Sequence, residues 1–206
     1  MSKRYVAIFC FSFVILSLQI VLSLLLDVIA YIPFIAISFS FFGLSLAGVY
    51  TFIKYYSQGQ KSKNYLPIRQ MILGGTHIII SLAVLYYYNQ FAIEVLEKIG
   101  SGQLKTTLNY LRLHIIFCST LAGVLFSIAF FQFGTIVCLL YKENSDQSPK
   151  FYLFDLCGAA MGCIFTVIIL NLLQVGSVLI FLASTVFALS WYLRPCTIWR
   201  ENRWEI

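Results

Sequence analysis

Long apolar runs separated by short polar stretches dominate the pattern of this chain. A helix needs roughly 20 apolar residues to cross a bilayer, and runs of about that length recur along the sequence. We place six membrane segments at residues 5–26, 28–53, 70–88, 113–140, 151–173 and 175–193, the third continuing as helix toward Lys98. The pattern therefore predicts an all-α fold, a polytopic transmembrane bundle of six helices that forms one integral membrane domain over residues 1–206.

The first apolar run is predicted to be a retained membrane helix. It follows the basic start Ser2-Lys3-Arg4, and Val28-Ile29-Ala30 loosely resembles a signal-peptide cleavage site. Its apolar stretch of about 22 residues exceeds the 7–15 residues of the apolar region of a signal peptide. We therefore expect this segment to stay in the bilayer.

The connections between the predicted helices are short. A tight turn at residues 27–31 makes the first two helices an antiparallel hairpin, and a turn at residues 174–176 joins the last two. Residues 55–67 form a polar loop at one side of the membrane. Residues 89–112 lie on the opposite side, with a short amphipathic extension that ends at Gly100-Ser101-Gly102.

The composition excludes an ordinary water-soluble domain. Only 11% of the residues are charged and 60% are hydrophobic, whereas soluble domains carry about 25% charged residues. The net charge of +6 is interpreted through membrane topology and not as a nucleic-acid surface, because Lys and Arg mark cytoplasmic loops. Eleven of the 14 Lys and Arg residues fall on the side that holds both termini, which predicts cytoplasmic termini in a bacterial inner membrane.

The residue types that support enzyme chemistry are sparse. No CxxC pair occurs among the six cysteines, and all but Cys196 lie in apolar runs, where cysteine packs as a small hydrophobic side chain. The two histidines, His77 and His114, lack metal-ligand spacing, and no glycine-rich phosphate loop or GxSxG motif is present. We expect no metal, no cofactor and no catalytic residues.

Two polar side chains inside apolar runs are candidates for binding a substrate, namely Gln19 and His77. Polar and ionisable residues within a membrane are often functional. A structural role explains both residues as well, because Gln19 can bond to Asn171 and His77 to a neighbouring helix. Both interpretations are open from the sequence alone.

Asp155 is the third candidate and the one acid outside the loops. If Ser148 caps the fifth helix and Pro149 occupies its first turn, Asp155 lies about 9 Å inside the helix, near the cytoplasmic surface. A positional role, paired with Lys142 or Lys150, and a role in binding a substrate or a proton are both open.

Small residues are expected to bring helix backbones together, because van der Waals packing drives helix association in lipid. Gly158 and Gly162 form a GxxxG pair directly after Asp155. Similar small-residue faces contain Gly43 and Gly48 in the second segment and Gly123 in the fourth. Such faces predict a compact bundle.

The block Tyr152-Leu-Phe-Asp155-Leu-Cys-Gly158-Ala-Ala-Met-Gly162 resembles a motif of bacterial fused spermidine synthase-like membrane proteins, in which Asp-Leu-x-Gly-Ala-x-x-Gly opens a membrane helix. The stretch from Phe117 to Gly123 is similar to a helix of that family that opens with Pro-Phe and then reaches a glycine, with Ile116 in place of proline. The opening hairpin, from Leu18 to Gly48, is similar as well.

Two departures from that family shape the functional expectation. Gln19 and Leu24 stand where members often carry charge, and residues 1–206 do not contain the family's soluble aminopropyltransferase-like domain. The resemblance therefore implies a non-catalytic membrane module that acts with a soluble spermidine synthase-like partner chain. The alternative is a small transporter or channel-like protein for a cationic or lipid-like substrate, and an intramembrane enzyme ranks last. Beyond the lipid bilayer, a homo-oligomer is a further possible partner.

Overall fold

The computed structural model describes residues 3–30, 33–56, 66–99 and 104–193. These residues form six α-helices: α1 (Lys3–Ala30), α2 (Pro33–Tyr56), α3 (Leu66–Ile99), α4 (Leu104–Glu143), α5 (Ser148–Leu172) and α6 (Val175–Leu193). A 3-10 turn, η1 (Ser145–Gln147), joins α4 to α5, and the described residues contain no β-strand. Each helix includes a stretch long and apolar enough to cross a membrane, so the expected all-α bundle of six such helices is confirmed.

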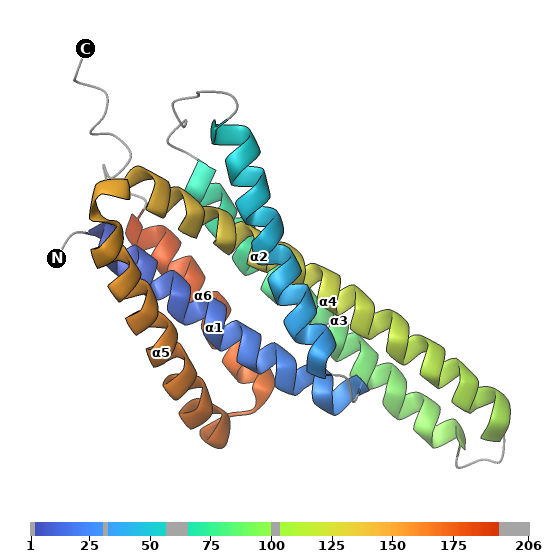
Figure 1. Ribbon diagram of the computed structural model, residues 1–206. Helices are drawn as coiled ribbons and strands as arrows, with labels where there is room; N and C mark the ends of the chain where they lie inside the picture. The colour runs from blue at the N-terminus through green and yellow to red at the C-terminus, as the bar shows by residue number, and fades with distance from the viewer. Residues whose placement is uncertain (1–2, 31–32, 57–65, 100–103, 194–206) are drawn as a thin grey trace.

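Helix α1 is the centre of the bundle and packs against α2, α4, α5 and α6 (Figure 1). It is apolar around its whole circumference, as expected for a helix surrounded by other helices, and its side chains from Ile8 to Leu22 supply much of the fully buried core. Helix α5 packs mainly on α1 and touches α6 only slightly. The outward side of α5 is apolar and exposed, which suits contact with lipid.

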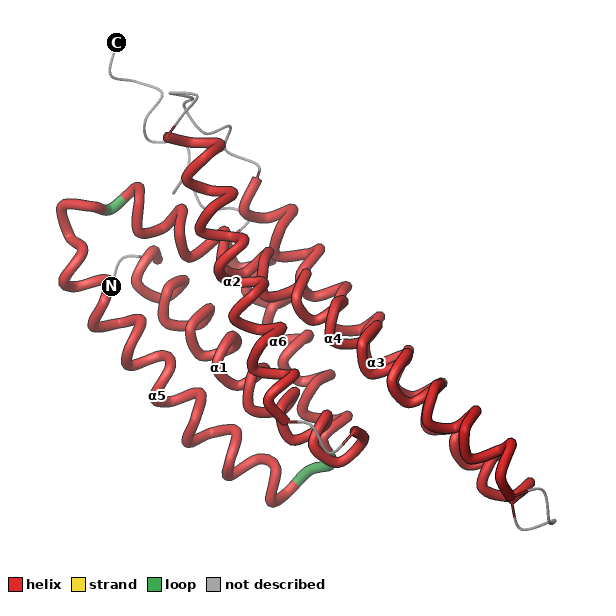
Figure 2. Tube along the Cα trace, turned by 45° about the vertical axis from the view of Figure 1, so that its right-hand side comes forward, coloured by secondary structure: helices red, strands yellow, loops and turns green. Residues whose placement is uncertain are grey.

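Helices α3 and α4 form an antiparallel pair that extends past the rest of the bundle (Figure 2). Their membrane-length stretches cover Ile68–Tyr88 and Ile116–Glu143. Residues 89–99 and 104–115 therefore continue as helix beyond these membrane-length stretches, by about 16–18 Å at 1.5 Å per residue. The predicted continuation toward Lys98 is confirmed, and α4 likewise begins at Leu104, before its membrane-length stretch, which starts at Ile116, near the predicted residue 113.

Two further boundaries differ from the sequence prediction. Helix α1 continues to Ala30, through most of the turn predicted at 27–31, and α2 begins at Pro33, where proline is well tolerated in a first turn. At α5 the N-cap residue is Gln147, with no side-chain cap hydrogen bond, and Ser148 is already helical. The 3-10 turn before α5 accounts for this shift. Gly100-Ser101-Gly102 and Cys196 lie outside the described residues.

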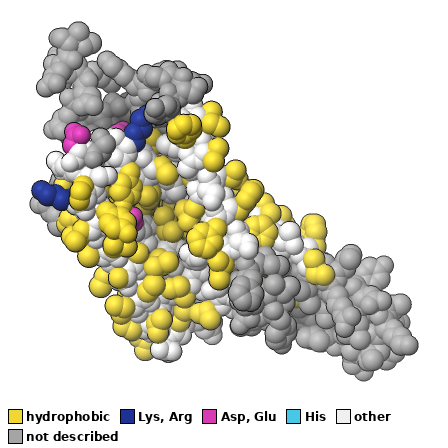
Figure 3. Space-filling model, viewed as in Figure 1, with side chains coloured by type: hydrophobic (Ala, Val, Ile, Leu, Met, Phe, Trp, Pro, Cys, Tyr) yellow, Lys and Arg dark blue, Asp and Glu magenta, His cyan; other side chains and the backbone are white. Residues whose placement is uncertain are grey.

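Basic side chains gather at the end of the bundle where α1, α3 and α5 begin and α2, α4 and α6 end (Figure 3). The described members of this group are Arg4, Lys54, Arg69, Lys142 and Lys150. We call this the basic end. Exposed Trp191 and Tyr192 lie at the same end, while exposed Tyr86 and Tyr87 lie near the opposite end of the α3 span. Aromatic side chains favour the two membrane–water interfaces, and these residues lie where such interfaces would be expected.

Candidate functional site

The close contact between α1 and α5 positions Asp155. A Cβ atom at Gly158 would overlap the carbonyl oxygen of Phe9, and one at Gly162 would lie 2.6 Å from the carbonyl oxygen of Phe13. Real Cβ atoms do not approach backbone atoms so closely, so only glycine permits this packing. One turn before Gly158, the half-buried Asp155 is therefore held against α1.

Both carboxylate oxygens of Asp155 accept hydrogen bonds from neighbouring helices. The hydroxyl of Ser12 on α1 donates to Oδ1, and the hydroxyl of Tyr141 on α4 donates to Oδ2 at 2.8 Å. The Ser12 hydroxyl also lies 2.9 Å from the carbonyl oxygen of Ile8, within its own helix. We call Ser12, Tyr141 and Asp155 the carboxylate clasp, because together they tie α1, α4 and α5.

A second set of polar contacts lies nearer the basic end. Arg4 Nη1 donates to Asn144 Oδ1 at 2.8 Å, and the Tyr5 hydroxyl donates to Gln147 Oε1. The Tyr5 ring also packs on Phe151, with ring centroids 4.9 Å apart. These contacts fix the beginning of α1 to the turn between α4 and α5.

The partners of Asp155 differ from the expected lysines. Lys150 is exposed and lies five residues before Asp155 on the same helix, so it faces a different direction. The actual partners are two hydroxyl groups, from residues 143 and 14 positions away in the sequence. Sequence reasoning missed Ser12 and Tyr141, since nothing in a chain this apolar marks one hydroxyl among many as the partner of an acid.

His77 is half-buried on α3, and its Nδ1 lies 2.6 Å from the carbonyl oxygen of Leu73. Because a carbonyl oxygen only accepts, Nδ1 carries the hydrogen and donates it. The bond runs within α3 and not to a neighbouring helix, which corrects the structural role expected for His77. The side chain of His114 lies outside the described residues.

Gln19 is half-buried on α1, seven residues or about 10 Å beyond Ser12. Asn171 is exposed to the surroundings of α5, and no hydrogen bond joins it to Gln19 among the described residues, so that predicted pair is wrong. His77 belongs to α3, which packs mainly on α4 and α6, whereas Asp155 belongs to α5 on α1. The three candidate residues therefore lie at separate places and form no shared site.

The glycines expected at helix contacts divide into two groups. At the α2–α4 contact, Gly43 lies against the backbone of Ser127 and Gly123 lies against the ring of Phe39. At Gly48, in contrast, an added Cβ would meet nothing within 4 Å, which corrects its predicted role in packing.

Chemically, the arrangement around Asp155 can hold helices together, and it offers no assembled catalytic set. Within the described residues, no three His, Cys, Asp or Glu side chains come together as a metal site. The five described cysteines are free thiols, and only Cys157 is exposed. No protein-family model, curated protein sequence or solved structure matches this chain. Functional inference therefore rests on the geometry.

Proposed function

We propose that this chain is a non-catalytic integral membrane module that works with a soluble partner enzyme. The observation that carries this proposal is the carboxylate clasp. An acid inside an apolar run is the natural candidate for a substrate site, yet both oxygens of Asp155 are engaged by hydroxyls of α1 and α4. The acid thereby joins three helices of a scaffold.

The packing of the bundle centre supports the same proposal. Phe11, Phe126, Phe130 and Phe133 are fully buried between the helices. Hydroxyl groups in the interior bond to carbonyl oxygens of their own helices, as Ser81 does to His77 and Thr135 to Phe131. Such local bonding satisfies polar groups without a water-filled path.

The partner would dock at the basic end, which the positive-inside tendency favours as the cytoplasmic side of a bacterial inner membrane. There the chain presents Lys54, Arg69, Lys142 and Lys150. The resemblance of the Asp155–Gly162 block to spermidine synthase-like membrane proteins makes a soluble aminopropyltransferase-type chain the proposed partner. In this structure, the same block supplies the glycines and the acid that hold α5 on α1.

A transporter or channel for a cationic or lipid-like substrate is the second candidate. His77 favours it, because this residue lies about 13 Å from the start of the Ile68–Tyr88 span, near the middle of a bilayer core of about 30 Å. Histidine at that depth is uncommon and is often functional.

Affinity purification of the full chain in mild detergent, followed by mass spectrometry of soluble proteins, tests the proposed module. We expect a soluble aminopropyltransferase-type enzyme to copurify, and to be lost when Lys142 and Lys150 are both changed to glutamate. The matched control changes exposed Tyr86 and Tyr87, at the opposite interface, to glutamine. Uptake of a polyamine by vesicles containing only this chain, abolished by Asp155→Asn at unchanged stability, would instead establish the transporter.

A further inference from the structure

Asp155 lies at the edge of the contact between α1 and α5. Phe151 and Gly158, about one turn to either side of it along α5, are buried, whereas Tyr152 and Leu156 are more than half exposed. Asp155 itself is half-buried, so its side chain borders both the helix contact and the surroundings of α5. Figure 3 shows acidic atoms among hydrophobic side chains on the face formed by α1 and α5.

The charge of the Asp155 carboxylate has no cationic partner among the described residues. Its two hydrogen bonds come from the hydroxyls of Ser12 and Tyr141, which are neutral. No ion pair joins Asp155 to a basic side chain in the part of the chain that the structure describes. An ionised carboxylate has about four lone-pair positions on its two oxygens, so the carboxylate clasp leaves roughly half of them unused. Asp155 therefore offers a ligand both a charge and hydrogen-bond acceptors.

The depth of Asp155 makes this charge costly. The membrane-length stretch of α5 is Ser148–Leu172, and Asp155 lies about 10 Å from its beginning. With the stretch centred in a hydrocarbon core of about 30 Å, Asp155 would lie roughly 7 Å inside the apolar layer. Charged side chains inside a membrane are unfavourable unless they have a partner. Because the described residues supply no cation, we expect a ligand to supply it.

The surroundings of the carboxylate favour an amphiphilic cation over a soluble one. The outward side of α5 is apolar along its length, and Leu156, Ile164 and Val167 are exposed on it. A hydrocarbon chain that lies along this side replaces lipid without loss of apolar contact. A soluble polyamine would have to bring several charges into the apolar layer. A calcium or magnesium ion takes about six or more oxygen ligands, whereas Asp155 is a single carboxylate.

We propose that Asp155 binds the ammonium group of a membrane-soluble primary amine, whose hydrocarbon chain lies along the outward side of α5. A primary ammonium has three donor hydrogens and no acceptor, so it complements the unused lone pairs of the carboxylate. Charge-assisted hydrogen bonds of this kind are stronger than neutral ones. The exposed ring of Tyr152, three residues before Asp155, is placed to add a cation–π contact. The bonds from Ser12 and Tyr141 remain, because the ligand uses other lone pairs.

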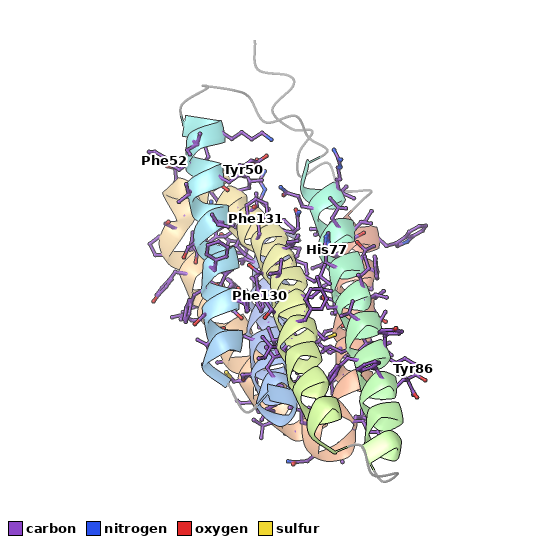
Figure 4. All side chains as sticks on the ribbon, turned by 90° about the vertical axis from the view of Figure 1, so that its right-hand side faces the viewer. Tyr50, Phe52, His77, Tyr86, Phe130 and Phe131 are labelled. Atoms are coloured by element: carbon purple, nitrogen blue, oxygen red, sulfur yellow. The ribbon has the colours of Figure 1, made fainter. Side chains whose placement is uncertain are left out.

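His77 is separate from this site and provides a control at a similar distance from the basic end. It belongs to α3, which packs mainly on α4 and α6, whereas α5 packs mainly on α1. Figure 4 shows His77 in a view in which α5 lies behind the other helices. A ligand at Asp155 is therefore expected to be insensitive to a change at His77.

The test uses the full chain in phosphatidylcholine nanodiscs, because this lipid has no primary amine. The probes are a photoreactive long-chain primary amine and its N-acetyl derivative, which has the same chain but no charge. Relative to the amount of each probe in the bilayer, we expect the amine to label α5 near Asp155 about five-fold more than the acetylated probe. The comparison uses the unaltered protein, so it does not depend on the folding of any variant.

Variants then assign the site. Asp155→Asn should lower labelling by the amine to the level of the acetylated probe, whose own labelling reports whether the bundle is intact. Tyr141→Phe weakens the carboxylate clasp but keeps the charge, so it should preserve the preference for the amine and separate ligand binding from stability. The controls are Asp146→Asn, at an exposed acid before α5, and His77→Phe, and both should leave labelling unchanged.

Several results would contradict the proposed amine site. Equal labelling by the amine and the acetylated probe would overturn it. So would a preference for the amine that persists in Asp155→Asn, or one that is lost equally in Asp146→Asn, since both would indicate general attraction of cations to the protein. Displacement of the amine by spermidine at equal ionic strength would assign the carboxylate to a soluble polyamine instead. None of these results bears on the proposed soluble partner, whose copurification is measured separately.

Discussion

Tyr141, near the end of α4, donates a hydrogen bond of 2.8 Å to the carboxylate of Asp155, 14 residues later in α5. The bond closes the turn between these helices, and Ser12 extends the connection to α1. An acid that could have served transport is thus part of the contact between helices.

Replacing Tyr141 with phenylalanine removes one donor to Asp155 and keeps the ring. We expect the free energy of unfolding in detergent to fall by about 1 kcal/mol, the usual magnitude for a hydrogen bond between membrane helices. Tyr86→Phe, at an exposed tyrosine on α3, is the control and should leave stability unchanged. Equal stability of both variants, in a reversible denaturation experiment, would show that the clasp contributes nothing.

Gly158→Ala should separate α1 from α5, because the new Cβ would overlap the carbonyl oxygen of Phe9. Overpacking of this kind typically lowers stability by about 1–3 kcal/mol. Gly48→Ala is the matched control, since its Cβ would meet nothing within 4 Å, and we expect it to be neutral or slightly stabilising. Thermal melting of the two variants side by side measures the difference, and the same loss in both would contradict the packing described for α5.

Asp155→Asn should weaken the bundle without abolishing a transport activity. Asparagine keeps one acceptor oxygen but loses the charge, and its NH2 group can only donate where Asp155 accepted. One of the two charge-assisted bonds from Ser12 and Tyr141 is therefore replaced by a weaker bond between neutral groups. We expect a lower melting temperature, and unchanged polyamine flux in reconstituted vesicles. The opposite pattern, with normal melting and altered flux, would identify Asp155 as a substrate-binding residue.

An accessibility tag in residues 57–65, which connect α2 to α3, tests the proposed orientation. Because α2 ends and α3 begins at the basic end, we expect the tag to react with an impermeant reagent only after the cells are opened. A second tag in residues 100–103, between α3 and α4, serves as the control and should react in intact cells. The reverse pattern would invert the orientation and move the proposed partner to the other side of the membrane.

Length and hydropathy along the sequence were sufficient to predict the six helices. Because successive helices run in opposite directions, they also predicted that most of the described basic residues lie at the same end of the bundle. Each crossing of a bilayer needs about 20 apolar residues, and its backbone groups must be hydrogen-bonded within the protein. Both requirements apply to each segment separately, so they can be recognised in the sequence without knowing how the segments pack. The boundaries that differed, at Ala30 and Leu104, involve helix that continues beyond the apolar stretch. Outside the apolar stretch, hydropathy does not show where a helix begins or ends.

The tertiary structure alone decided which sides of the helices meet. In lipid, a buried side and a lipid-facing side are equally apolar, so the sequence carries no amphipathic pattern that distinguishes them. Gly158 and Gly48 read alike in the sequence, yet one lies against the backbone of α1 and the other has no neighbour. In the same way, only the fold brought Ser12 and Tyr141 to Asp155, because such contacts depend on how helices rotate against one another.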